Sequence, residues 1–164
     1  MLADELALVA NLVRGQRQAA LATIHNGLPN VAMVGYAAEP DFGAVLLYLS
    51  RLAAHTRHLL ADPAAALLIA EPDDRRDDVQ TLARITLSGA AQPIEPGSAA
   101  FAAGQACYLA RLPTAEMLFS LPDFVLFRVV PREARYVGGF GRIYTLTPAL
   151  LRQAASATML PAEH

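Results

Sequence analysis

Two runs of strand-forming residues meet at an Asn-Gly pair, and this feature constrains the fold more than any other in the chain. Residues 19–25 and 29–36 are rich in apolar and β-branched side chains. Asn26-Gly27 between them suits the two left-handed positions of a tight hairpin turn. The sequence therefore predicts an antiparallel β-hairpin near the start of the chain.

Short strands alternate with short helices and turns along the rest of the chain. Ser50 precedes a helical segment that ends before Pro63, because proline cannot continue a helix. Gly89 marks a bulge or a close approach of two backbones, and Pro131 is expected to end a strand. Helices are predicted over residues 2–13, 52–61, 97–119 (two short helices broken at Pro113) and 148–157, strands over 19–25, 29–36, 44–49, 64–70, 82–92, 124–130 and 134–137, and a solvated loop over 72–78. This order predicts a mainly β fold, an antiparallel barrel with helical insertions, and not a parallel α/β sheet.

Length and composition set the size and class of the protein. At 164 residues the chain fits a single domain, residues 1–164, with an N-terminal helix within 1–16 and a C-terminal helix and tail over 148–164. Its apolar fraction is 54% and its charged fraction is 17%. A chain of this composition has more apolar surface than a small monomer can bury. We therefore expect a homodimer whose interface covers the surplus.

The charged residues exclude some functional classes and disfavour others. All 13 basic residues are Arg, so Schiff-base chemistry on a lysine is excluded. The net charge of −2 provides no basic field for nucleic acid. Asp4 and Glu5 stand where a signal peptide has positive charge, and apolar runs such as 64–70 are too short to cross a membrane. Cys107 has no mate for a disulfide, so we expect a cytoplasmic protein.

The segment from Ser50 to Arg57 is the most informative candidate for a binding site. It places Ser50, Arg51, His55, Thr56 and Arg57 at the end of a strand and the start of a helix, where free N–H groups and the helix dipole favour an anion. Hydroxyls and arginines there would bind a phosphate through charge-assisted hydrogen bonds. The same residues also suit a plain strand end, an N-cap and a solvated helix face. Both interpretations stay open at this point.

This segment, continued to Pro63 and the apolar strand after it, resembles the second flavin-contacting segment of the pyridoxamine 5′-phosphate oxidase-like split barrels. Residues 121–131 (LPDFVLFRVVP) and 136–142 (YVGGFGR) resemble the haem-utilisation branch of that superfamily. With the Asn26-Gly27 hairpin, the likeness covers nearly the whole chain. It implies a bacterial, homodimeric FMN-binding split barrel of antiparallel Greek-key type, with its cofactor where the two subunits meet.

The resemblance to flavin-binding relatives implies one set of site residues. The FMN phosphate would be held at the start of the helix, by Ser50, His55, Thr56 and Arg57 with the adjacent Arg51. Arg84, early on the following long strand, would reach the cofactor, and the strand that contains Val34 would run along the isoalloxazine ring. Ala54 and His55 stand where a Ser-Arg-Lys type of cluster is expected, which weakens phosphate binding. Nothing in the sequence resembles the substrate-gripping C-terminal segment of the oxidases, so that activity is set aside.

The haem-utilisation branch implies a second set of residues. His164 would be the axial ligand of the haem iron, or else it belongs to a mobile tail or an expression tag. Asp123 would orient such a histidine through a hydrogen bond. Gly139, in the run Gly-Gly-Phe-Gly at 138–141, would let the backbone pass close to a planar cofactor, or the run forms a bulge or turn.

The remaining candidates favour structural roles. His25 and His58 are expected at the surface, and the four histidines lack the spacing of a zinc site. Aromatic side chains are expected to pack in the core and interface rather than to form a stacking platform; these are Phe101, Tyr108, Phe119, Phe124 and Phe127.

Two functional hypotheses follow, and a third stands beside them. The first is an FMN-dependent oxidoreductase in which the flavin performs the electron transfer, so that no protein nucleophile is needed. The alternative is a haem-binding or haem-degrading protein of iron utilisation. The third is a split-barrel dimer whose cofactor site has decayed. The sequence identifies no catalytic residue, substrate or electron donor.

Overall fold

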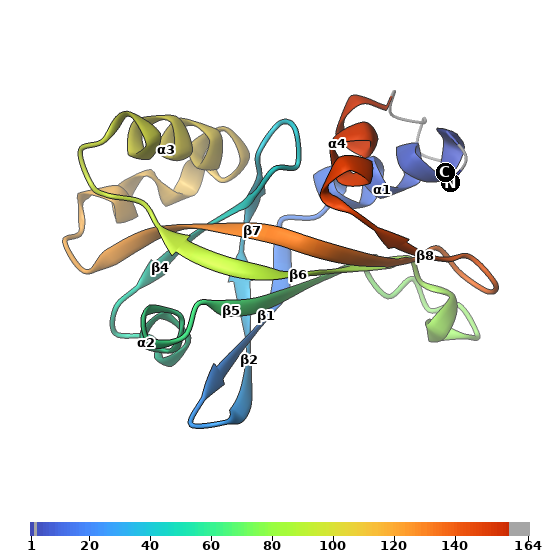
Figure 1. The fold of residues 1–164 in the computed structure, drawn as a ribbon, viewed down its shortest axis with the longest axis horizontal. Helices are drawn as coiled ribbons and strands as arrows, with labels where there is room; N and C mark the ends of the chain where they lie inside the picture. Colours follow the sequence, from blue (N-terminus) through green and yellow to red (C-terminus); the bar gives the residue numbers. More distant parts are fainter. Residues whose placement is uncertain (2, 158–164) are drawn as a thin grey trace.

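The computed structural model describes residues 1 and 3–157. In this part of the chain the strands form one eight-stranded sheet that carries helices on both faces (Figure 1). The elements in chain order are α1 (Ala3–Gly15), β1 (Gln18–His25), β2 (Leu28–Gly35), β3 (Ala37–Ala38), β4 (Val45–Ser50), α2 (Ala54–Ala61), β5 (Ala64–Ala70), the 3-10 helix η1 (Val79–Thr81), β6 (Arg84–Pro93), α3 (Ala99–Arg111), the 3-10 helix η2 (Pro113–Ser120), β7 (Phe124–Val137), β8 (Ile143–Leu146) and α4 (Pro148–Ser156).

The sheet has the order β2-β1-β5-β6-β7-β4-β3, and β8 pairs with β7 beside this path. Every paired strand runs antiparallel to its neighbour. The sheet curls so that β2 approaches β4 across the gap between its edges. The predicted fold class is thus confirmed: the chain forms a mainly β, antiparallel split barrel with helical insertions.

The Asn-Gly hairpin has the predicted geometry. Asn26 and Gly27 both adopt positive φ, 51° and 75°, and His25 pairs directly with Leu28. Such a turn matches the right-handed twist of the two strands it joins. The hairpin projects from the rest of the barrel at the bottom of Figure 1.

The expectation that Pro131 ends a strand is wrong. β7 continues through Pro131 to Val137, because the register against β6 shifts between Ser88 and Gly89. Pro131 faces Gly89 at this irregularity, where its missing N–H breaks no regular ladder. A Cβ on Gly89 would lie 2.0 Å from the carbonyl oxygen of Val130, so Gly89 is the close-approach point that the sequence indicated.

The helix expected over 52–61 begins two residues later, at Ala54. Its N-cap is Ala53, which makes no side-chain capping bond. Ser50, three residues earlier, therefore does not cap it. The other helices follow the sequence closely: α3 and η2 divide at Pro113, and α4 starts at Pro148 behind the capping hydroxyl of Thr147.

Two apolar clusters hold the fold together. The larger fills the barrel between the inner face of the sheet and the helices α1 and α4, and Leu21, Leu47, Leu67 and Tyr136 lie in it. The smaller lies on the opposite face of β4, where alternate side chains such as Leu46 and Tyr48 meet α3 and η2. The predicted core aromatics divide accordingly: Phe127 lies in the larger cluster, and Phe101, Tyr108, Phe119 and Phe124 lie in the smaller one.

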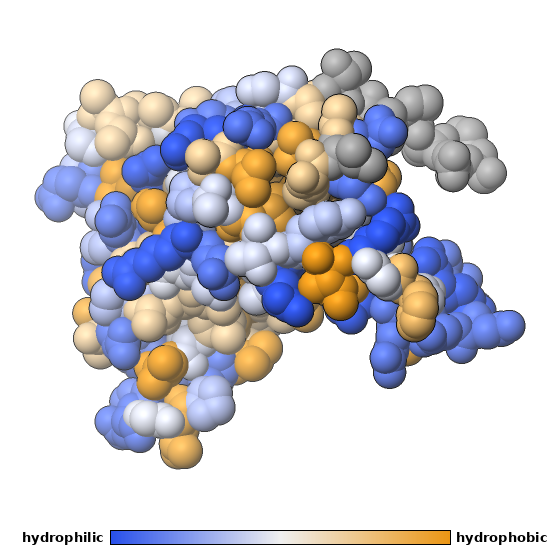
Figure 2. Space-filling model, turned by 45° about the vertical axis from the view of Figure 1, so that its right-hand side comes forward, coloured by the Kyte–Doolittle hydropathy of each residue, from blue (hydrophilic) through white to orange (hydrophobic). Residues whose placement is uncertain are grey.

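The charged segment over residues 72–78 is a solvated loop, as predicted. All seven residues are exposed, and they form the hydrophilic lobe at the lower right of Figure 2. The contacts of its charged side chains are short-range, such as Arg76 with Asp74 and Glu71. We assign this loop no function.

Candidate functional site

Ser50 and Asp123 join the end of β4 to the start of β7. The Ser50 hydroxyl donates to Asp123 Oδ2 at 2.8 Å and accepts from the Leu52 amide at 3.1 Å. The Arg51 amide donates to the Asp123 carbonyl at 2.6 Å. These bonds are possible because Ser50 pairs with Phe124 in the antiparallel ladder, which puts Asp123 beside the strand end. The half-buried Asp123 carboxylate is therefore held in a defined orientation.

An aromatic cluster packs beneath this pair. The rings of Tyr48 and Phe119 stack with centroids 3.8 Å apart, and Phe124 lies 5.0 Å from Tyr48. The Tyr48 hydroxyl donates to the Leu118 carbonyl. Burial, and then the nearby charge of Asp123, raise the pKa of Tyr48. Tyr48 is therefore a neutral, fixed part of the wall and offers no base near neutral pH.

The start of α2 forms the other side of the site. Thr56 is completely buried, and its Oγ1 makes no hydrogen bond within the described residues. Arg57 is exposed and donates to the Leu52 carbonyl at 2.6 Å. Arg51 is exposed, and His55 is half-buried with a pKa lowered by burial and by His58. The structure thus brings Ser50, Asp123 and the residues from Arg51 to Arg57 into one region.

Two of the residues predicted to hold the FMN phosphate have no free hydroxyl, and a third makes a backbone contact. The Ser50 hydroxyl proton points to Asp123, Thr56 lies out of reach of solvent, and Arg57 is engaged by a backbone carbonyl. A phosphate placed here would also face the Asp123 carboxylate, and like charges at close range repel. Of the predicted phosphate ligands, Arg51 and Arg57 therefore remain accessible, whereas Ser50 and Thr56 do not offer a free hydroxyl.

Arg84 and Gly139 lie together, but elsewhere. Arg84 starts β6 beside Val137 at the end of β7, and its guanidinium donates to the carbonyls of Gln80 and Leu82. Gly139 has a φ of 106°, in the left-handed region that favours glycine, which agrees with the turn that the sequence offered as one interpretation of this run. Phe140, next to it, is 98% exposed.

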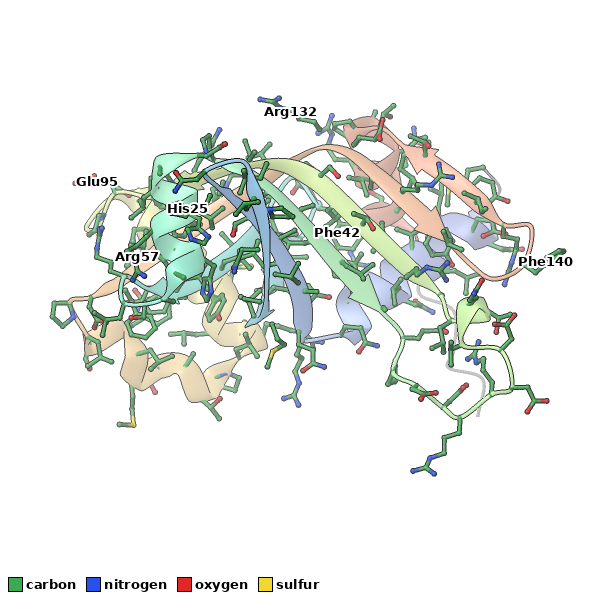
Figure 3. The ribbon with its side chains drawn as sticks, turned by 90° about the horizontal axis from the view of Figure 1, so that it is seen from below. His25, Phe42, Arg57, Glu95, Arg132 and Phe140 are labelled. Carbon is green, nitrogen blue, oxygen red and sulfur yellow. The ribbon has the colours of Figure 1, made fainter. Side chains whose placement is uncertain are left out.

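The two groups occupy opposite ends of β7. Ser50 pairs with the first residue of this 14-residue strand, Phe124, whereas Arg84 pairs with the last, Val137. A strand of this length spans roughly 40 Å at about 3.3 Å per residue. Figure 3 shows the same separation, with Arg57 near one end of the molecule and Phe140 at the other. One chain alone therefore does not bring Arg84 and Gly139 to Asp123.

Val34 and His164 complete the predicted set. Val34 is 4% exposed and packs in the larger core cluster, so only its backbone is available to a ligand. Val31 and Met33, on the other face of β2, are exposed instead. His164 lies outside the described residues, and its role as an axial ligand stays a prediction.

Two features of this region have no clear signal in the sequence. His25 and His58 were expected as separate surface residues, but their rings stack with centroids 4.6 Å apart. Glu39 and Arg128 form a two-pronged ion pair, 2.6 Å at each contact, between the β3–β4 turn and β7. Both pairs join residues far apart in sequence, so only the register of the sheet could have indicated them.

Comparison with known proteins places the chain in a family. The family described as CREG, beta-barrel matches residues 3–150, which include every strand of the sheet. The chain belongs to the CREG β-barrel family. This agrees with the resemblance to the pyridoxamine 5′-phosphate oxidase-like split barrels and their haem-utilisation branch.

Two curated relatives carry names that refer to haem. The chloroplastic heme oxygenase HOZ of Arabidopsis thaliana is 40% identical over 116 residues, which are 70% of this chain and 33% of HOZ. The heme oxygenase HutZ of Vibrio cholerae is 28% identical over 129 residues, which are 77% of this chain and 72% of HutZ. The chain thus spans about a third of the length of HOZ.

Solved structures agree on the fold. A heme binding protein from Mycobacterium smegmatis superposes with a TM-score of 0.81 at 29% identity, over 93% of this chain and 60% of that one. A putative pyridoxamine 5'-phosphate oxidase from Listeria innocua superposes with a TM-score of 0.63 at 13% identity, over 82% of this chain and 99% of that one. At that identity the second likeness shows the fold alone.

Proposed function

We propose that this chain binds haem at the end of the sheet where Ser50 and Asp123 meet, and that it serves haem storage or oxidative haem breakdown. The observation that carries the proposal is the oriented carboxylate. Ser50 and the Arg51 amide fix Asp123, while its Oδ1 accepts no hydrogen bond from the described residues. Such an oxygen suits a hydrogen bond to a haem ligand, because partners of this kind orient the groups that bind iron.

The surroundings of Asp123 suit the rest of a haem. Large apolar side chains on the adjoining segments are exposed: Leu52, which follows the Ser50 turn, and Met117 are each 80% exposed, and Leu121 is 43% exposed. They offer an apolar surface for the macrocycle. Arg51 and Arg57 are exposed beside them, and arginine pairs well with carboxylates such as the haem propionates.

A bound haem supplies an iron that binds or activates dioxygen, depending on its axial ligand and the polarity around it. The roles of the chain's own residues follow from their positions. Asp123 would accept a hydrogen bond from the imidazole that binds the iron, for which His164 is our candidate. Ser50 would keep Asp123 in place, and the aromatic cluster around Tyr48 would keep water from the apolar side.

The relatives support haem rather than FMN. HOZ and HutZ are named as heme oxygenases, and the mycobacterial neighbour as a heme binding protein. The split-barrel fold, shared with the Listeria protein, is the feature that keeps an FMN oxidoreductase as the second candidate. The Ser50–Asp123 bond and the burial of Thr56 weigh against it, because they remove donors that the FMN phosphate requires.

We also propose that the chain acts as a homodimer through the outer face of β2, β1, β5 and β6. The ladder aligns two rows of side chains across this face: Met33, Ala20, Leu68 and Thr86, then Val31, Ala22, Ala66 and Ser88. Met33 and Val31 are 72% and 65% exposed. Uncovered apolar side chains in such a patch are typical of an interface.

The border of this face is suited to a second copy of the same chain. Arg132 and Glu133 follow each other on β7 beside Ser88 and project outward, as Figure 3 shows for Arg132. Across a two-fold axis, Arg132 of one copy would meet Glu133 of the partner. A two-fold axis that runs across β7 would also bring the Arg84 and Gly139 end of one chain toward the Asp123 end of the other. The cytoplasmic location stays a prediction, and the relative HOZ is named as chloroplastic. Among the described residues, no helix is long and apolar enough to span a membrane.

A haem titration of matched variants tests the site. Asp123→Asn is expected to weaken haem binding about 10-fold, since loss of a hydrogen-bond partner of a metal ligand typically has this effect. His164→Ala is expected to shift the Soret band. Asp77→Asn, in the exposed loop over 72–78, is the control and should bind haem like the wild type. Equal affinity of the Asp123 and Asp77 variants would overturn the proposed site.

A further inference from the structure

Three histidines gather where α2 meets the β1–β2 hairpin. His25 at the end of β1 and His58 on α2 stack with ring centroids 4.6 Å apart and planes 11° apart. His55 lies three residues before His58 on the same helix, within electrostatic range of it. Figure 3 shows His25 against the helix, with Arg57 on the same side of the molecule.

The stack is tied to a buried hydroxyl of the sheet. His58 Nδ1 shares a hydrogen bond of 3.0 Å with Thr23 Oγ1, and Thr23 is 1% exposed. His25 Nε2 lies 3.2 Å from the Asn26 amide nitrogen, which fixes the orientation of the other ring. The two imidazoles therefore form a clamp between β1 and α2.

The helix itself has little intrinsic stability. α2 has eight residues, its N-cap Ala53 makes no side-chain bond, and its first turn contains no acidic residue. A helix this short is marginal in water without tertiary contacts. Its attachment rests on the buried side chains of Thr56 and Leu59 and on the clamp at His58.

Most of the groups around the clamp are cationic or neutral. α2 contributes His55 and Arg57, and Arg51 precedes the helix. β1 contributes His25, while β2 has no titratable side chain. Asp62, the C-cap of α2 four residues after His58, accepts a bond from the Ala64 amide. Protonation of the stack would therefore bring like charges together beside His55 and Arg57.

We propose that the His25–His58 stack is a pH-sensitive clamp that holds α2 on β1 at neutral pH and releases it on acidification. This inference goes beyond haem binding and does not depend on it. Release would act on the candidate site, because α2 starts directly after the turn that carries Ser50, Arg51 and Leu52.

The direction of the response follows from the pKa shifts. Burial first, and then the charges of His25 and Arg57, lower the pKa of His58 below its ordinary 6.5; burial and His58 lower that of His55. The docked helix therefore binds fewer protons than the released one. Docking is fully favoured above pH 6.5 and weakens as the pH falls through 6.5 and lower.

Amide hydrogen exchange of the ligand-free full chain, corrected for intrinsic rates, tests the clamp. Between about pH 7.5 and about pH 5.5, on either side of the ordinary histidine pKa, protection of α2 should fall about 10-fold relative to α4, which contains no histidine. His25→Phe keeps a ring in the stack and keeps the His58–Thr23 bond, but it removes one proton site. Because burial still lowers the pKa of His58 in this variant, it should keep part of the acid response but retain more of the α2 protection at the lower pH than the wild type does.

His55→Gln is the comparison variant, because it removes a histidine of the same helix outside the stack. It should lose only the part of the acid response that comes from His55 and keep the part that comes from the stack. The proposal is overturned if wild-type α2 stays equally protected at both pH values, or if His25→Phe loses protection as the wild type does. Because no haem is present, either result leaves the haem proposal to its own test.

Discussion

Replacing Ser50 with Ala tests whether the Asp123 carboxylate is positioned by the protein. Ser50→Ala removes the 2.8 Å bond to Asp123 and the acceptor of the Leu52 amide. Hydrogen bonds to charged groups contribute about 1.5–3 kcal/mol, and the half-buried position favours the lower end. We therefore expect the free energy of unfolding to fall by about 1.5 kcal/mol. For a chain of this length, that lowers the melting temperature by roughly 3–6 °C.

A double-mutant cycle separates this bond from the other effects of the substitution. Chemical denaturation of Ser50→Ala, Asp123→Ala and the double variant should give a coupling energy of about 1 kcal/mol. Ser120→Ala is the control, because its exposed hydroxyl donates only to the nearby Met117 carbonyl, and it should change stability by less than about 0.5 kcal/mol. A coupling energy below about 0.3 kcal/mol would refute the reasoning, since independent sites add within that range.

Two further predictions concern the backbone of the sheet and its outer face. Gly89→Ala should lower the free energy of unfolding by about 3 kcal/mol or more in chemical denaturation, because the new Cβ would overlap backbone atoms of Val130 and Pro131. Gly15→Ala is the control: its Cβ would meet nothing within 4 Å, so it should be neutral or stabilise by up to about 1 kcal/mol. Equal effects of the two would contradict the close approach. Light scattering should show a dimer for the wild type and a monomer for the double variant Val31→Asp/Met33→Asp. Met117→Asp, on a different exposed surface, should stay dimeric. A wild-type monomer at micromolar concentration would contradict the proposed interface.

Local chemistry in the sequence predicted much of the fold. Asn26-Gly27, Pro63, Gly89 and Pro148 each have one conformational role, and the structure uses each in that role. The prediction at Pro131 was wrong because proline ends a strand only where a regular ladder needs its N–H, and the register shift at Gly89 interrupts the ladder there. The start of α2 was misplaced because Ser50 has a capping residue's chemistry but binds Asp123 instead.

The candidate site was predictable only in part. Ser50 and Asp123 were named from separate segments, and the sheet register joins them at 2.8 Å. Arg84 and Gly139 were named for a cofactor site from two other segments, and within one chain both lie at the opposite end of β7. Val34 was named on the strand expected to run along the flavin ring, and its side chain packs in the core. The sequence alone did not show these placements, because strand direction and register are long-range properties.

The absorption spectrum of the purified protein, titrated separately with haem and with FMN, tests the central claim most directly. We predict a shifted Soret band that saturates with added haem and no retention of FMN after gel filtration. Retention of FMN with a flavin spectrum, and no Soret shift at tens of micromolar haem, would contradict haem binding at Asp123 and favour the flavin alternative. Binding of neither cofactor would instead indicate a split barrel whose site has decayed.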